Sequence, residues 1–189
     1  IKYSYEYITE VLKVDKDKLW FTVYKDDDEA YQIWREVIGV PADRIQRGNE
    51  DNFWHMNIPG PCGPCSEIFI DRGKKYGKDG GPIGGGEDRF IEIWNLVFME
   101  SIQDQPFQVI DELPKKNIDT GMGLERMAMI MQDKDNLFDT DLFKPLHDAL
   151  LSQITENDDK YEKIIIDHIK SSTFMISDGV VPTNEGRGY

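Results

Sequence analysis

The stretch RFIEIWNLVFME (89–100) is a strong strand signal, and the fold class follows from what surrounds it. Aromatic and β-branched residues dominate it, which is typical of strands with buried side chains. A second apolar stretch, FQVIDEL (107–113), follows after QDQP, whose polar residues and proline favour a turn. We therefore expect the two strands to pair as an antiparallel hairpin.

Strand and helix signals continue on both sides of this hairpin. Strands are expected at 19–25 and 66–72, and helices at 1–13, 26–39, 122–131, 139–154 and 161–176, with Pro145 in a first turn or at a kink. Residues 49–63 and 73–88 are expected to be irregular, because prolines or glycines crowd them. Strands and helices do not alternate regularly, so we predict an α+β fold whose antiparallel sheet is flanked by helices, with a helical C-terminal extension.

The composition is that of an ordinary globular protein, with 39% hydrophobic and 31% charged residues. The formal net charge of −14 argues against a stand-alone nucleic-acid binder, although a local patch could still meet nucleic acid. No apolar run approaches the roughly eighteen residues of a membrane span, and the first residues lack the layout of a secretion signal. We expect a cytoplasmic protein.

A C-x-x-C pair, Cys62 and Cys65, raises the possibility of zinc or redox chemistry. A structural zinc needs four ligands, and the histidines at 55, 147 and 168 are scattered. A redox pair would need a thioredoxin-like parallel unit, which is not visible. We expect no zinc here, and small thiols packed under a tight entry into the next strand.

The glycine-rich stretch GGPIGGG (80–86) invites comparison with phosphate-binding loops. It lacks the Gly-Lys-Ser/Thr ending and the helix that would direct backbone amides at a phosphate. We interpret it as a flexible hairpin tip.

Asn95 is a lone amide on an apolar strand face. Simple alternation places Asn95 and Val97 on one face of 89–100 and Glu92 on the other. Two interpretations remain open at this point. The amide could satisfy a neighbouring loop, as buried amides usually do, or it could line a small pocket with Val97 as its floor.

The stretch NIDTGMGLER (117–126) combines bare backbone with opposite charges at a strand end or turn that leads into a helix. Asp119 could bind a ligand ammonium, Gly121 and Gly123 permit close approach to the backbone, and Arg126 could meet phosphate or stack on a base. Alternatively, the aspartate caps the helix, the glycines form a turn, and the two charges make a surface ion pair. Spacing alone favours neither interpretation.

Five blocks in order resemble the bacterial-type alanyl-tRNA synthetases, a family of class II aminoacyl-tRNA synthetases. The blocks are NFWHM (52–56), GPCGPCSEIF (60–69), IEIWNLVFME (91–100), DTGMGLERMA (119–128) and DHIKSSTFMISDGVVPTNEGRGY (167–189). The resemblance spans essentially the whole chain. It implies the class II fold, an antiparallel sheet flanked by helices, with GMGLER as the third signature motif.

The resemblance also assigns an alanine site. Asp119 would hold the ammonium group, with Gly121 as the backbone that comes close. Asn95 would hydrogen-bond the amino acid, Val97 would bound its methyl group, and Trp54 would form a wall.

For ATP, the resemblance points to Gly123 and Arg126 of the third motif. Glu92 is a further metal or ATP contact by analogy, although alternation places it opposite Asn95. The implied reaction activates alanine with ATP and Mg²⁺ to alanyl-adenylate and then transfers the alanyl group to the 3′ end of tRNA(Ala). It requires no protein nucleophile.

The resemblance further implies a division into a partial catalytic domain (1–158) and the start of a helical tRNA-recognition region (159–189). Motifs one and two, with the arginines that hold ATP, would precede Ile1 in the full-length protein. We expect the isolated chain, without the rest of the polypeptide, to be inactive. Alanine-dependent exchange between ATP and pyrophosphate by the isolated chain would contradict this. The alternative is a non-catalytic synthetase-like module that binds an amino acid or a nucleotide.

Overall fold

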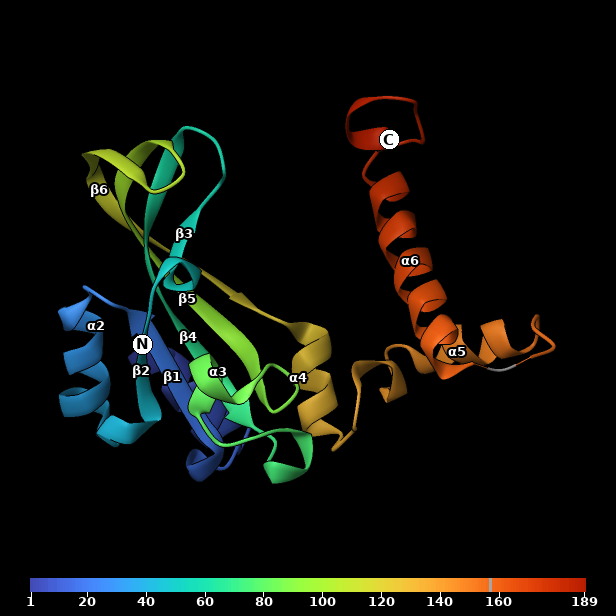
Figure 1. Cartoon of the computed structure of the whole chain (residues 1–189), viewed down its shortest axis with the longest axis horizontal. Coiled ribbons are helices and arrows are strands. Elements are labelled where there is room, and N and C mark those ends of the chain that lie inside the picture. Colours follow the sequence, from blue (N-terminus) through green and yellow to red (C-terminus); the bar gives the residue numbers. More distant parts are fainter. Residues whose placement is uncertain (157) are drawn as a thin grey trace. The chain divides into compact units, whose positions relative to one another are not determined.

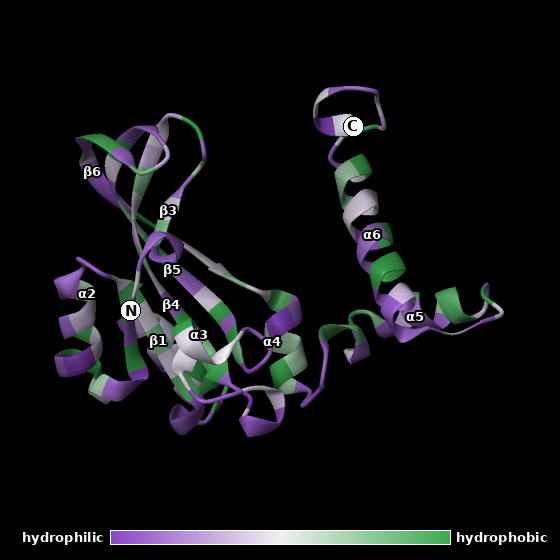
Figure 2. Cartoon of the chain, viewed as in Figure 1, coloured by the Kyte–Doolittle hydropathy of each residue, from purple (hydrophilic) through white to green (hydrophobic). Residues whose placement is uncertain are grey.

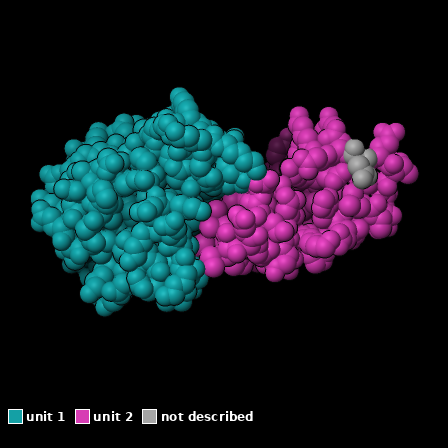
Figure 3. All heavy atoms as spheres, turned by 90° about the horizontal axis from the view of Figure 1, so that it is seen from below, with its two compact units in different colours: residues 1–123 teal, residues 124–189 magenta. Residues whose placement is uncertain are grey.

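The computed structural model describes residues 1–156 and 158–189 (Figure 1). These residues form two compact units, 1–123 and 124–189, coloured separately in Figure 3. The predicted functional boundary after residue 158 falls within the second unit. It stays a prediction, because compactness does not identify the residues that bind tRNA.

The first unit is built on a six-stranded sheet with the order β2-β1-β4-β5-β6, and β3 pairs with β4. The strands are β1 (Leu19–Tyr24), β2 (Ile45–Gly48), β3 (Phe53–His55), β4 (Gly60–Asp71), β5 (Phe90–Gln105) and β6 (Gln108–Met122). All pairs are antiparallel except β1–β2, which is parallel. The predicted α+β fold with a helix-flanked sheet is confirmed, and the sheet is mixed rather than wholly antiparallel.

The predicted β5–β6 hairpin is confirmed, and both strands are longer than expected. Gln105 pairs with Gln108 across the turn, where Phe107 has a positive φ of 63°. β6 continues to Met122, well beyond the apolar stretch that signalled it. Most of the side chains of β6 are exposed, so its sequence carries little of the alternating hydrophobic pattern by which a half-buried strand is predicted.

The prediction that residues 60–63 are irregular is wrong, because β4 begins at Gly60. Prolines are tolerated in sheets mainly at edges and bulges. The register between β4 and β5 shifts between Cys62 and Cys65, so Pro64 lies in an irregular part of the ladder. The short strands β2 and β3 were also not expected, because three or four residues carry too little periodicity.

Helices cover one face of the sheet. α1 (Lys2–Glu6) and α2 (Asp28–Gln32) each continue as a π-helical segment, Tyr7–Val11 and Ile33–Ile38 respectively. Trp34 is fully buried, its ring centroid lies 4.1 Å from that of Phe21, and its Nε1 donates to Ser66 Oγ at 2.8 Å. Both predicted helices are confirmed.

The opposite face is covered at one end by the glycine-rich segment, which forms the short helix α3 (Gly81–Gly85). Gln46 fixes it, donating from Nε2 to Gly80 O at 2.8 Å and accepting from Ile83 N at 3.0 Å. A Cβ at Gly85 would lie 2.1 Å from the Phe90 ring. The prediction of a flexible tip is therefore wrong, because the glycines allow close packing on the sheet.

The second unit is helical, as expected. It contains α4 (Leu124–Met131), α5 (Lys144–Leu151) and α6 (Asp159–Ser177), and Pro145 lies in the first turn of α5. Figure 2 shows hydrophobic and hydrophilic residues in bands along α6.

Short 3₁₀ segments occur in both units. They are Lys16–Lys18, Ala42–Arg44, η5 (Glu50–Asn52), Lys74–Tyr76, Leu137–Asp139 and Gly186–Gly188. Within the described residues, no helix is long and apolar enough to cross a membrane.

Candidate functional site

The strand register brings four of the predicted site residues together. β5 pairs with β6 so that Asn95 lies opposite Gly121 and Val97 opposite Asp119. Cross-strand partners share a face of the sheet. On the other side of β5, Glu67 lies opposite Asn95 and Cys65 opposite Val97. We call these six residues and their surroundings the Asn95 face.

Glu92 also lies on the Asn95 face, which corrects the prediction from simple alternation. Ile68 pairs with Trp94 and the next residue, Phe69, pairs with Glu92, so Ile93 is an extra residue in β5. Such a β-bulge shifts the alternation by one position. Glu92 therefore shares the face of Phe69 and Glu67, and its charge is among the causes that raise the pKa of Glu67.

Trp54 reaches the same face through a neighbouring strand. In the β3–β4 pair it lies opposite Gly63, two residues before Cys65 in β4, and its side chain is half-buried. Alternation along β4 then places Trp54 beside the Val97 end of the Asn95 face.

The Asn95 amide is only half satisfied by the protein. Its Nδ2 donates to Glu67 Oε1 at 3.2 Å. Its Oδ1 is buried and has no hydrogen-bond partner among the described residues. A buried acceptor without a partner is costly and calls for an explanation. The structural interpretation accounts for one end of this amide, and a ligand that donates a hydrogen bond would account for the other.

Glu67 is buried and held by three donors. Besides Asn95, its Oε2 accepts from Thr22 Oγ1 at 2.8 Å and from Asn52 Nδ2 at 3.1 Å. Burial raises the pKa of Glu67 to about 7, outweighing these hydrogen bonds. A carboxyl with a raised folded pKa stabilises the fold below its unfolded pKa, and this contribution is lost as the pH rises through about 7.

Asp119 and Gly121 lie on the open part of the face. Asp119 is exposed. The one hydrogen bond that the structure describes for its side chain is local, from Thr120 N to Oδ1 at 2.8 Å. It belongs to β6 and α4 begins at Leu124, so the interpretation of Asp119 as a helix cap is wrong. A Cβ added to Gly121 would meet nothing within 4 Å. Packing within the chain therefore gives no reason for glycine here, whereas close approach of a ligand does.

The other two residues of the predicted third motif are Gly123 and Arg126. Gly123 N donates to Ile93 O at 3.2 Å and extends the β5–β6 ladder by one bond. Arg126 is exposed on α4, in the second unit. Their predicted contacts with ATP stay predictions.

The two cysteines do not face one another. Cys62 and Cys65 are buried and free, and three positions apart in a strand they point to opposite faces. Burial, followed by the charge of Glu67, raises the pKa of Cys65 to about 12, so this thiol stays protonated. In the part of the chain that the structure describes, no group of three or more histidine, cysteine or acidic residues could hold a metal.

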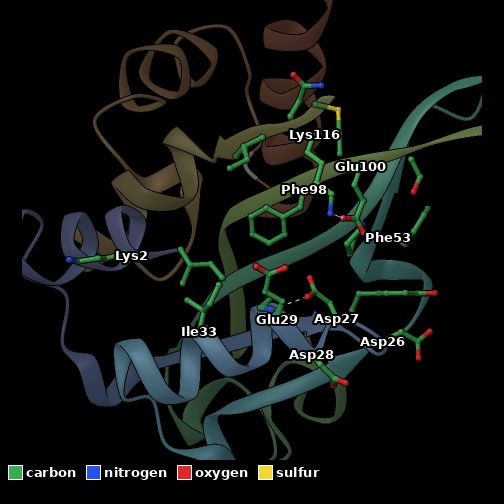
Figure 4. A pocket seen from close by; sticks show the side chains of 18 residues that line it. Lys2, Asp26, Asp27, Asp28, Glu29, Ile33, Phe53, Phe98, Glu100 and Lys116 are labelled. Atoms are coloured by element: carbon green, nitrogen blue, oxygen red, sulfur yellow. Dashed lines mark hydrogen bonds and ion pairs between the residues drawn. The ribbon is translucent and has the colours of Figure 1, made fainter. Parts of the chain in front are cut away.

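A cavity of about 860 Å³ lies on the other face of the sheet (Figure 4). Phe98 and Ile118 line it, and each lies next in sequence to a residue of the Asn95 face, so their side chains point the opposite way. Ile33 and Glu29 contribute from the helical side. This cavity is therefore separate from the predicted site.

Sequence reasoning missed Glu67, together with its partners Thr22 and Asn52. The sequence did contain a signal for Glu67. It is an acidic residue within the strand SEIFIDR, which is otherwise largely apolar at its centre, just as Asn95 is a single amide within an apolar strand. Thr22 and Asn52 lie in different elements, and only the fold brings them to it.

Comparison with known proteins shows the family of the chain. The family model described as tRNA synthetases class II (A) matches residues 1–189. An alanine–tRNA ligase of Corynebacterium glutamicum (strain R) is 52% identical over 188 residues, covering 93% of this chain and 21% of the relative. Those of Mycolicibacterium gilvum and Frankia alni are 53% and 50% identical, covering 93% and 100% of this chain. The chain spans about a fifth of the length of these relatives.

Proposed function

The chain belongs to the class II (A) tRNA synthetases, and from this we propose that it forms part of the aminoacylation site of an alanine–tRNA ligase. The observation that carries the proposal is the unpaired Asn95 Oδ1, which shares a face with the exposed carboxylate of Asp119. Together they offer hydrogen-bond acceptors and a negative charge, and an amino acid's ammonium supplies the matching donors and charge.

The remaining residues of the face suit a small amino acid. Gly121 leaves open space where the ligand's Cα approaches the backbone. Val97, which is 5% exposed, forms a floor, and Trp54 bounds the site at one end. A methyl side chain fits such a site, and larger side chains are excluded by sterics.

In the proposed reaction, a carboxylate oxygen of alanine attacks the α-phosphorus of ATP and pyrophosphate leaves. The 3′-terminal ribose hydroxyl of tRNA(Ala) then attacks the carbonyl carbon of the adenylate, and AMP leaves. No protein side chain forms a covalent bond. The chain contributes by binding and orienting the alanine ammonium, so that most of the catalysis comes from positioning and charge.

ATP binding requires cations that the Asn95 face lacks. Among the described strand residues, Phe90 to Val97 and their cross-strand partners include no lysine or arginine, whereas Glu67, Glu92 and Asp119 are acidic. We propose that Glu92 would help to hold Mg²⁺, which would supply positive charge to the phosphates, since Mg²⁺ usually combines one or two carboxylates with phosphate oxygens. Gly123 and Arg126 are the proposed contacts to ATP.

We extend the proposal to the whole protein as follows. Residues 1–158 belong to the catalytic domain, residues 159–189 begin the region that recognises tRNA(Ala), and the protein works in the cytoplasm. The full-length protein is then expected to catalyse alanine-dependent ATP–pyrophosphate exchange. Alanine binding without exchange would instead favour the alternative, a non-catalytic module that binds an amino acid.

Gly121→Ala tests the open space beside the strand. In the full-length protein we expect it to raise the KM for alanine about tenfold, because the new methyl group would enter the open space in which the ligand is proposed to approach the backbone. Folding should be unaffected, since the added Cβ meets no atom within 4 Å.

Gly84→Ala is the matched control, because a Cβ there also meets nothing within 4 Å. Steady-state exchange kinetics over a range of alanine concentrations provide the measurement. Equal KM values for the two variants would place the alanine elsewhere.

A further inference from the structure

We propose that Glu67 is a positioning residue whose carboxylate fixes the orientation of the Asn95 side-chain amide and thereby presents Asn95 Oδ1 to the ammonium of the substrate. This inference rests on the proposed alanine site and goes one step further. It states that Glu67, which need not contact the ligand, determines which end of the Asn95 amide faces the ligand.

The chemistry of the two groups determines the orientation. An ionised carboxylate has only acceptors, so the amide must direct its NH₂ group to Glu67 Oε1, at 3.2 Å. The amide oxygen then points the other way, where it is buried and has no partner among the described residues. A flipped amide would turn two N–H donors toward the ammonium and repel it.

Glu67 is itself held in place from two further elements. Thr22 in β1 and Asn52 in η5 are both 2% exposed, and both donate to Oε2. Asn52 Nδ2 also donates to Thr22 Oγ1 at 2.7 Å. With Oε2 occupied by these two donors, Oε1 is left for Asn95.

Protonation of Glu67 would reverse this arrangement. The proton would go to Oε1, because Oε2 already accepts two hydrogen bonds, and the resulting O–H would face the NH₂ group of Asn95. The amide would then rotate, accept from Glu67 and turn its NH₂ group to the ligand.

The pH at which this happens is set by the surroundings of Glu67. Burial raises its pKa to about 7, the charges of Glu92 in β5 and Asp51 in η5 raise it further, and the bonds from Thr22 and Asn52 lower it. Cys65 of β4, which lies on the same face, remains neutral in this range. Affinity for alanine should therefore fall as the pH decreases through about 7.

Glu67→Gln in the full-length ligase is the direct test. The glutamine oxygen would accept from Thr22 and Asn52, so its NH₂ group would face Asn95 and flip the amide, as protonation does. At about pH 8.5 we expect the KM for alanine to rise about tenfold or more, with kcat and the KM for ATP changed much less. The variant should also lose the rise in alanine KM that the wild type shows at lower pH.

Thr22→Val separates positioning from loss of charge, because it leaves the carboxylate in place. It removes a hydrogen bond that lowers the pKa of Glu67. In this variant, the rise in alanine KM that accompanies protonation of Glu67 should occur at a higher pH than in the wild type. Well above that pH, where Glu67 is ionised in both proteins, the two KM values should be equal. A profile that does not move would contradict the inference.

Asn95→Ala separates failure of this inference from failure of the proposed site. If it raises the KM for alanine while Glu67→Gln has the wild-type KM at about pH 8.5, the positioning role is wrong and the site stands. If Asn95→Ala leaves the KM unchanged, the alanine site itself is wrong, and the inference fails with it. A Glu67→Gln protein that only unfolds more easily, with unchanged KM, would also overturn the inference.

Discussion

Asp119→Ala in the full-length protein is expected to raise the KM for alanine by about 100-fold or more, equivalent to about 2.7 kcal/mol of binding free energy. Losing the partner of a charged group costs more than losing a neutral hydrogen bond, because the ammonium is left without its counter-charge. Asp119 is the cross-strand partner of Val97 on the Asn95 face, two positions along the strands from the pair formed by Asn95 and Gly121.

The fold of this variant should be unaffected, since Asp119 is exposed and the only hydrogen bond described for its side chain is the one it accepts from Thr120 N. Asp119→Asn is the matched control, because it keeps an acceptor oxygen and removes the charge. Its KM should fall between those of the wild type and Asp119→Ala. Exchange kinetics at saturating ATP give both values, and a wild-type KM for Asp119→Ala would exclude Asp119 from the alanine site.

The second large effect is expected on stability. Trp34→Ala should lower the free energy of unfolding of the chain by about 3 to 5 kcal/mol, the usual range for removing a large buried aromatic side chain. Trp34 is fully buried against Phe21, and its indole donates to Ser66 Oγ in the central strand β4. The substitution leaves a cavity and removes that hydrogen bond.

Urea unfolding followed by circular dichroism measures this loss. Val37→Ala is the matched control, because Val37 lies in the same π-helical segment and is 66% exposed. It should change the free energy of unfolding by less than about 0.5 kcal/mol. Similar losses for both variants would mean that this segment does not pack on the sheet through Trp34.

The sequence predicted the elements that carry strong periodicity. The helix from 26 to 39 and the hairpin built on 89–100 are present, because their buried faces repeat at the helical and strand periods. The face shared by Asn95 and Val97 was predicted correctly for the same reason, since two residues two positions apart in an unbroken strand lie on one face.

The predictions were wrong or incomplete where the structure depends on backbone irregularity or on contacts between residues that are distant in the sequence. The bulge at Ile93 moved Glu92 to the Asn95 face, and nothing in the local pattern of β5 reveals an extra residue. The glycines of α3 pack closely on Phe90 and Gln46, whereas composition alone predicted a free loop. Glu67 acquires its raised pKa and its partners only when β1, η5 and β5 come together around it.

The measurement that tests the central claim most directly is a crystal structure of the full-length protein with alanine bound. We predict that the ammonium nitrogen lies within hydrogen-bonding distance of Asn95 Oδ1 and of the Asp119 carboxylate, with the methyl group toward Val97. Alanine bound instead in the cavity on the opposite face, beside Phe98 and Ile118, would contradict the account.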